Sequence, residues 1–240
     1  MPKHELLNNI DHKNIKVITE RSVKYGDNIW YTPTFWREFR SVQTSYPILF
    51  QKESGKESFV PLAIFGIQKG ENLFLTDEGW DAQYIPLSVQ RMPFYIGFQQ
   101  AKDSEDLKRV ITIDLESPRV SESEGRELFL EFGGNSDYLE AIANILETLH
   151  QGLEENNKFI SSLLEFDLLE PITLDVTLND GAKGQMIGFH TINEDKLKEL
   201  PKDVVLEFHK NGYLQAMYCA VLSQVKFGEL VRRKNNRIRF

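Results

Sequence analysis

The 240-residue sequence has a single cysteine, no long apolar run and no internal repeat. Cys219 cannot form a disulfide within the chain, and its apolar neighbours predict that it packs as a small hydrophobic side chain. No apolar segment approaches the about 18 residues of a membrane-spanning helix, so we expect a protein that does not span a membrane. The N-terminal segment lacks the apolar core of a cleaved signal peptide, which favours a cytoplasmic location.

Motifs of the common enzyme and metal-binding classes are also missing. The five histidines show none of the HxH or HxxxH spacings that place two metal ligands on one face, so we expect no metal site. The chain has no GxSxG nucleophile elbow, no Walker lysine and no Rossmann GxGxxG fingerprint. We therefore expect no cofactor and no catalytic residues, and we favour a protein that is not an enzyme.

Positive charge is scarce except at the C-terminus. Residues 226–240 contain six Lys or Arg residues and one acid, whereas the first 225 residues contain 22 basic and 35 acidic residues. An acidic body repels a phosphate backbone, which disfavours nucleic acid as the main partner. Charged chain ends are commonly solvated, so we expect residues 226–240 to be an exposed basic tail that folding does not need. Contact of this tail with an acidic partner, RNA or an anionic membrane is the alternative.

Apolar runs at residues 48–50, 59–67 and 73–75 alternate with polar connectors that contain glycine. This pattern predicts three adjacent strands of a meander, with residues 94–98 as a fourth strand. Further strands are expected at residues 15–25, 109–115 and 127–132. Residues 172–178 and 184–192 are expected to pair as a hairpin with its turn at Asp180-Gly181.

Helices are expected at residues 35–42, along a long stretch that starts near Ser136 and reaches about residue 164, and over most of the C-terminal part. Because Gly152 and Asn156-Asn157 are poor helix formers, the long stretch is expected to be either one kinked helix or two helices that share a face. Apolar residues at 214, 217, 218, 221, 222 and 225 predict one buried face on the helix after Gly212. Because the strands form local hairpins, the sequence predicts an α+β fold with a mainly antiparallel sheet, a long central helix and a helical C-terminus. No flexible linker interrupts it, so we expect residues 1–240 to form a single domain.

Large aromatic residues and arginines gather around residues 80–93, a segment that follows no helical or strand period. Trp80 and Tyr84 lie there, Arg91 precedes Met92-Pro93, and Arg119 follows Ser117-Pro118. An arginine beside aromatic residues and restricted backbone can bind a carboxylate or stack on a ring, and it can equally hold a loop to an acidic neighbour. Our hypothesis is that these four residues line one concave site for a small anionic molecule or a peptide.

Asp114 ends a β-branched strand and precedes a loop, where functional residues often collect. It is included in the candidate site, although an acid at this position can simply cap a turn. Asp114, His190 and His209 also define an alternative hypothesis, in which the protein is an enzyme of unassigned chemistry that uses them as acid or base.

An ordered series of motifs runs from about residue 46 to residue 230. It comprises YPILF, VPLAIFGIQKGENLF, YIP with RMPF, SPR, LLEP, NDG, GFHTINEDKL and the closing G-Y-L helix. In this order the motifs resemble the SapC family of bacterial proteins. Through the family's name, the resemblance implies an association with the bacterial surface layer. It gives no catalytic residues, because none are established for the family. Three possibilities are therefore retained: a cytoplasmic binding or accessory protein with a small-molecule or protein partner, an enzyme, and a surface-layer protein exported without a cleaved signal. Homo-oligomerisation stays open.

Overall fold

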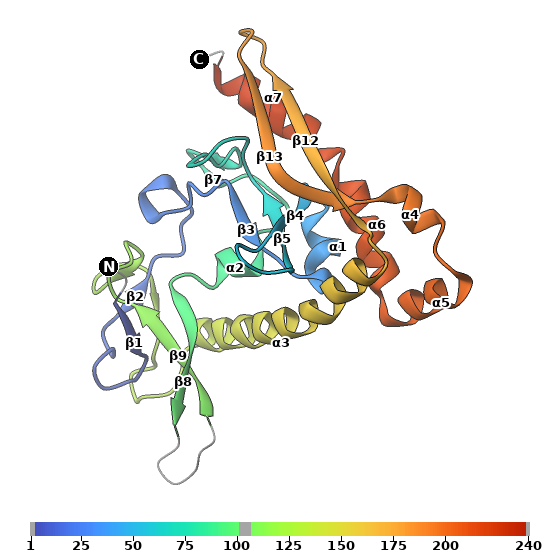
Figure 1. The fold of residues 1–240 in the computed structure, drawn as a ribbon. Helices are drawn as coiled ribbons and strands as arrows, with labels where there is room; N and C mark the ends of the chain where they lie inside the picture. Colours follow the sequence, from blue (N-terminus) through green and yellow to red (C-terminus); the bar gives the residue numbers. More distant parts are fainter. Residues whose placement is uncertain (1–2, 101–106, 239–240) are drawn as a thin grey trace. The chain divides into compact units, whose positions relative to one another are not determined.

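The computed structural model describes residues 3–100 and 107–238, which form two compact units (Figure 1). The first unit combines Met1–Asp27 with Leu87–Gln151, and the second combines Asn28–Pro86 with Gly152–Phe240. Helices and antiparallel sheets together confirm the predicted α+β class. That the two units unfold together as one domain stays a prediction. Within the described residues, no helix is both long enough and apolar enough to cross a membrane.

The first unit contains two small antiparallel sheets. In one, β9 (Leu107–Asp114) pairs with β8 (Phe94–Gln100) and with β1 (His4–Leu6), which confirms the predicted strands near residues 94–98 and 109–115. In the other, β2 (Lys16–Val17) lies between β10 (Val120–Ser121) and β11 (Arg126–Glu127). The core of this unit includes Val17, Phe94, Ile113, Leu128, Leu139 and Leu146.

Two of the predicted strands in this unit are shorter than expected. Of residues 15–25 only β2 is extended, and the 3-10 helix η1 (Val23–Tyr25) follows it. Of residues 127–132 only Glu127 is in a strand, as the end of β11, and the chain turns back at Gly133, whose φ of 94° is a conformation that glycine adopts without strain. A short helix, α2 (Leu87–Gln90), precedes β8.

The predicted long helix is the single element α3 (Asp137–Glu165), which is continuous over 29 residues and is not divided into two helices. Ser136 Oγ accepts a hydrogen bond of 3.2 Å from the amide of Leu139, which caps the helix at its first turn. Gly152 is a poor helix former but has a packing role in the second unit. A Cβ atom there would lie 2.4 Å from the Phe35 ring, so only glycine permits this close approach.

The second unit is organised on a five-stranded antiparallel sheet. Its order is β12 (Leu169–Thr177), β13 (Lys183–Ile192), β4 (Ile48–Lys52), β5 (Phe59–Ile64) and β3 (Tyr31–Pro33). The β12–β13 hairpin and the β4–β5 pair are confirmed. The expected third meander strand at residues 73–75 is wrong, since β6 (Leu75–Thr76) pairs with β7 (Gly79–Trp80) in a separate ribbon. Asn72 Oδ1 accepts a hydrogen bond from the amide of Phe74, an Asx turn that redirects the chain.

Short helices complete the second unit. The 3-10 helix η2 (Trp36–Glu38) continues into α1 (Phe39–Val42), and four helices form its C-terminal part: α4 (Glu194–Lys198), α5 (Lys202–Asn211), α6 (Tyr213–Ser223) and α7 (Lys226–Ile238). The predicted buried face of α6 is only partly correct. Met217 is buried together with Ala216 and Ala220, and α6 packs on α1 and β4, whereas Tyr218 and Leu222 are exposed and Val225 lies beyond the end of the helix. Small side chains allow the closer packing, which decides the face.

The expectation of a solvated C-terminal tail is also wrong. Residues 226–238 form α7, which runs alongside the β12–β13 hairpin (Figure 1). Lys234 forms an ion pair with Glu71, and the Arg237 guanidinium donates hydrogen bonds to the carbonyls of Asn72 and Leu75. These contacts hold the helix against the segment before β6. Residues 239–240 lie outside the described residues.

Candidate functional site

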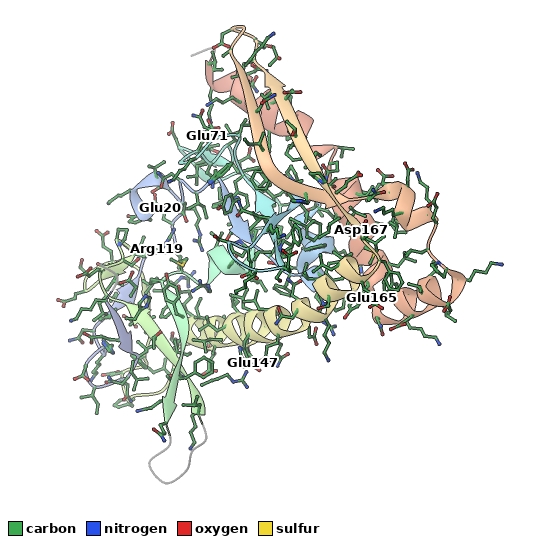
Figure 2. The ribbon with its side chains drawn as sticks, in the orientation of Figure 1. Glu20, Glu71, Arg119, Glu147, Glu165 and Asp167 are labelled. Atoms are coloured by element: carbon green, nitrogen blue, oxygen red, sulfur yellow. The ribbon has the colours of Figure 1, made fainter. Side chains whose placement is uncertain are left out.

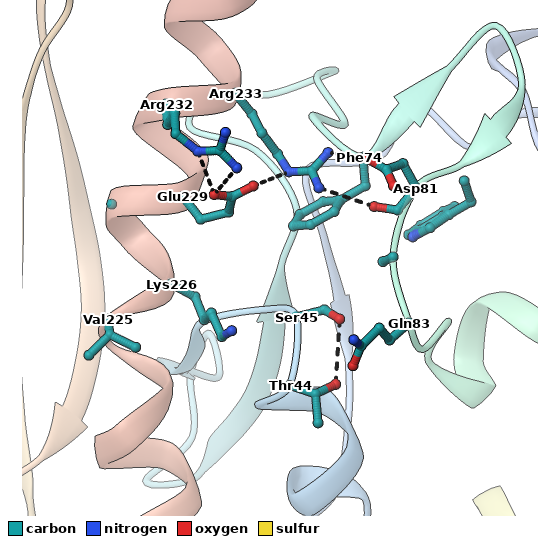
Figure 3. A pocket seen from close by; sticks show the side chains of 13 residues that line it. Thr44, Ser45, Phe74, Asp81, Gln83, Val225, Lys226, Glu229, Arg232 and Arg233 are labelled. Carbon is teal, nitrogen blue, oxygen red and sulfur yellow. Dashed lines mark hydrogen bonds and ion pairs between the residues drawn. The ribbon is translucent and has the colours of Figure 1, made fainter.

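The second unit contains an open pocket of about 730 Å³ (Figure 3). Three segments form most of its wall: the turn after α1, the loop after β7, and the beginning of α7. The lining residues include Thr44, Ser45, Phe74, Trp80, Asp81, Gln83, Val225, Lys226, Glu229, Arg232 and Arg233. Trp80, which the sequence analysis selected, is therefore a pocket residue.

Two arginines of α7 are bound by carboxylates at one side of the pocket. Arg233 donates hydrogen bonds of 2.8 Å to Glu229 and to Asp81, and its guanidinium lies 4.5 Å from the centroid of the Phe74 ring. Arg232 also donates to Glu229, at 2.8 Å. The two positive charges are thus matched by two negative charges (Figure 3).

Lys226 is the third cation of the pocket. Its half-buried side chain extends from α7 toward the turn that contains Ser45 (Figure 3). Within residues 3–100 and 107–238, its ammonium group has no hydrogen bond or ion pair. The hydroxyl oxygens of Thr44 and Ser45 lie 3.4 Å apart on the same wall. An ammonium group beside hydroxyl groups is an arrangement that suits a carboxylate.

Trp80 is held in the wall by a chain of hydrogen bonds that are buried or partly buried. Its Nε1 donates to Tyr46 Oη at 2.8 Å, and Tyr46 Oη donates to the Tyr84 carbonyl at 2.5 Å. Tyr84 Oη and Thr34 Oγ1 each donate to the carboxylate of Glu38, at 2.8 and 2.6 Å. Burial raises the pKa of both tyrosines, and the nearby Glu38 raises the pKa of Tyr84 further. The hydroxyl groups of Tyr46 and Tyr84 are therefore uncharged at neutral pH, and their hydrogen bonds fix the position of Trp80.

The five predicted site residues fall into two groups. Trp80 and Tyr84 lie in the second unit and meet at Tyr46, but only Trp80 lines the pocket. Arg91, Asp114 and Arg119 belong to the first unit. A single site that contains all five residues stays a prediction.

Arg119 is buried, with 2% of its surface exposed, and its guanidinium has three acceptors (Figure 2). It donates to the carbonyls of Ile18 and Glu20 at 3.0 and 2.8 Å, and to Asp27 Oδ2 at 2.5 Å. Arg21 donates to the other carboxylate oxygen of Asp27 at 3.3 Å, and its pKa is lowered by burial and by Arg119. These contacts match the interpretation of Arg119 as a residue that holds loops together.

Arg91 and Asp114 also have local partners. Arg91 donates to the carbonyl of Phe94 at 2.7 Å, and its guanidinium lies 4.3 Å from the centroid of the Tyr95 ring. Asp114 Oδ1 accepts hydrogen bonds from the amides of Lys3 and Glu116, at 2.9 and 3.2 Å. The second of these is the turn-capping contact that the sequence analysis gave as the alternative for Asp114.

His190 and His209 belong to the second unit, whereas Asp114 belongs to the first. The His190 ring packs edge-on against Phe59 at 4.7 Å, and burial and Lys52 lower its pKa. His209 lies in the last turn of α5. Within the part of the chain that the structure describes, no three His, Cys, Asp or Glu side chains gather as a metal site would require. Acid–base roles for these residues stay a prediction.

The sequence analysis missed Lys226, Glu229 and Arg233 because it treated residues 226–240 as a tail. Their spacing of three and four residues places them on one face of a helix, which is the signal that helical periodicity offers. No local sequence pattern marks Asp81 and Ser45 as site residues, because they come close to α7 only in the folded chain.

Comparison with protein families gives one match, to SapC, over residues 7–230. The match includes most of both units and the pocket residues from Thr44 to Glu229, whereas Arg232 and Arg233 lie beyond its end. Comparison with curated proteins and with solved structures gives no match. Because the family match extends over nearly the whole chain, the protein belongs to the SapC family.

Proposed function

We propose that this protein is a non-catalytic binding protein that takes the carboxylate of a small anionic molecule or a peptide into the pocket beside α7. The observation that supports it is Lys226, a half-buried residue of the pocket wall whose ammonium group has no partner among the described residues. Removing a charge from water costs free energy unless a counter-ion or hydrogen bonds compensate it. A ligand carboxylate supplies both.

The remaining wall supplies selectivity. Three cationic and two anionic side chains line the pocket, and the two anions are bound to Arg232 and Arg233. One positive charge is left over, so an anionic ligand is favoured over a cationic one. The rings of Trp80 and Phe74 provide apolar surface next to that charge. A molecule with a carboxylate on an apolar body matches this combination.

The pocket favours binding over catalysis. Glu229 and Asp81 are held in ion pairs, and no histidine or cysteine is among the described residues that line it. A general base requires a group that is free to accept a proton near neutral pH. We therefore place recognition, rather than acid–base chemistry, at this site.

Calorimetric titration tests the proposal with a panel of short peptides and di- and tricarboxylic acids. We expect at least one of these carboxylates to bind the wild type and to bind Lys226→Met at least about tenfold more weakly, because a charged hydrogen bond contributes about 1.5–3 kcal/mol. Lys202→Met is the matched control, since Lys202 is an exposed lysine of the same unit, at the start of α5. Equal affinity for wild type and Lys226→Met, or no binding of any carboxylate, would contradict the proposal.

The cellular location is part of the same proposal. We expect the protein in the cytoplasm, where a small carboxylate or the segment of a partner is accessible to it. Fractionation of cells that produce the full chain, with an antibody against it, separates this location from the surface-layer alternative. Recovery mainly in the cell-surface fraction would exclude the cytoplasmic role.

A further inference from the structure

Helix α6 is apolar on two faces, and the residues that the structure describes cover only one of them. Ala216, Met217 and Ala220 are buried on the inner face. On the other face, Tyr218 and Leu222 have exposed fractions of 50% and 61%, and Val225, in the turn after the helix, is 75% exposed. Solvent-facing sides of helices are normally polar, so an apolar outer face indicates that something covers it.

The three exposed residues form a continuous strip, which we call the α6 stripe (Tyr218, Leu222 and Val225). Tyr218 and Leu222 are four residues apart and therefore lie on one side of α6, and Val225 follows in the turn between α6 and α7. Residues 213–225 contain no charged side chain, so neither a positive nor a negative group interrupts the strip. This surface favours apolar side chains of a partner and repels no charge.

The α6 stripe leads directly into the pocket. Val225 belongs to the stripe and also lines the pocket, and Lys226 is the next residue along the chain (Figure 3). An uncharged apolar surface therefore ends at an ammonium group that has no partner among the described residues. The complementary molecule has apolar groups along its length and a carboxylate at one end.

We propose that the α6 stripe and the pocket together bind an acidic peptide segment of another protein. Apolar side chains of the segment cover Tyr218, Leu222 and Val225, and an Asp, Glu or C-terminal carboxylate binds Lys226. This inference rests on the proposed function and makes it specific, because a small carboxylate fills the pocket but leaves the stripe exposed. The positive charge left over among the pocket residues selects acidic segments over basic ones.

A phage-displayed library of random peptides, selected on the full chain, tests this inference. We expect enriched segments in which Asp or Glu lies next to two or more apolar residues. An enriched peptide is then synthesised with a fluorescent label and titrated by anisotropy. Leu222→Ser and Lys226→Met should each weaken its binding at least about tenfold, because each removes one half of the surface. Leu153→Ser, an exposed leucine of α3, and Lys202→Met are matched controls and should change affinity less than about twofold.

The outcomes separate this inference from the proposed function. A selection without acidic and apolar enrichment, or full binding to Leu222→Ser and to a second variant, Val225→Ser, overturns the peptide inference. In that case, small carboxylates that still bind the wild type and fail to bind Lys226→Met leave the proposed function standing. If Lys226→Met binds peptide and carboxylates like the wild type, both fail. A concentration-dependent dimer that Leu222→Ser abolishes would assign the stripe to a second copy of the chain and overturn the peptide inference.

Discussion

Two clusters in this protein pair arginines with carboxylates, and they differ in burial. The sealed cluster of the first unit pairs Asp27 with Arg21 and Arg119, and the side chains of Asp27 and Arg119 are 5% and 2% exposed. In the pocket cluster of the second unit, Asp81 and Glu229 pair with Arg233, and the Asp81 side chain is 62% exposed. Both clusters consist of arginine guanidinium and carboxylate groups, but the carboxylate of the first is buried and Asp81 of the second is exposed to solvent.

The difference shows how burial decides the role of an ion pair. In the sealed cluster, Arg119 donates three hydrogen bonds, to Asp27 and to two carbonyl oxygens, and only 2% of its surface is exposed, so a ligand from solvent cannot reach it. In the pocket cluster, water reaches the pairs, and Lys226 beside them is unbonded within the described residues. We infer that the first cluster stabilises the fold and that the second prepares a surface for binding.

The largest effect is expected from Arg119→Ala. The substitution leaves Asp27 buried with a weaker partner, and breaking a buried pair costs about 3–5 kcal/mol of unfolding free energy. Urea denaturation measures it. Arg109→Ala is the control, because the Arg109–Glu147 pair is 44% exposed on both sides and should contribute less than about 1 kcal/mol. If Arg119→Ala leaves the unfolding free energy unchanged, the first cluster does not stabilise the fold, and Arg119 is favoured as a ligand-binding residue.

Lys234→Met tests a pair of intermediate burial in the second unit. Lys234 forms an ion pair with Glu71, whose side chain is 10% exposed, so the variant leaves a carboxylate that little solvent reaches. We expect a loss of about 2 kcal/mol in unfolding free energy. Arg232→Met, on the same helix but 66% exposed, should change it by less than about 0.5 kcal/mol. If Lys234→Met also lowers the unfolding free energy by less than about 0.5 kcal/mol, the ion pair does not stabilise the fold, and α7 is then a solvated helix that the fold does not need.

The buried phenols behind the pocket predict a loss of stability at high pH. Folding raises the pKa of Tyr46 and Tyr84, so between about pH 10 and the folded pKa the unfolded chain has lost protons that the folded chain keeps. Unfolding free energy is therefore unaffected by these groups below about pH 10 and falls above it, by up to about 1.4 kcal/mol per pH unit for each tyrosine.

Urea denaturation between about pH 9 and about pH 11 measures this slope. The double variant Tyr46→Phe, Tyr84→Phe should show a shallower fall than the wild type. Tyr218→Phe changes an exposed tyrosine of α6 and is the control. Identical slopes for the wild type and the double variant would show that these phenols ionise as freely in the folded chain as in the unfolded chain.

The smallest effect on stability is expected from Lys226→Met. Its ammonium group has no partner among the described residues, so we expect unfolding free energy to stay within about 0.5 kcal/mol of the wild type. The same variant should lose most of its affinity for a carboxylate ligand. Calorimetry and urea denaturation on one preparation compare the two. A loss of more than about 2 kcal/mol in stability would move Lys226 into the class of fold-stabilising cations.

Local patterns in the sequence were sufficient for much of the fold. The β12–β13 hairpin follows from alternation around Asp180-Gly181, and α3 follows from its apolar period and its Ser136 cap. The candidate site was predicted only in part, since Trp80 lines the pocket and Tyr84 supports it from behind. Arg91, Asp114 and Arg119 were chosen for local features that are equally typical of loop-holding residues.

The sequence by itself determined the α+β class, the family and the elements whose signals are local. These signals are periodicity, caps and turns, and each depends on residues within a few positions of one another. Only the tertiary structure decided which face of α6 is buried, and that α7 packs against residues 71–81. The pocket joins residues 44, 81 and 226, and no local rule relates them. Packing of small side chains and pairing of distant charges made those choices, because both depend on contacts between segments far apart in the chain.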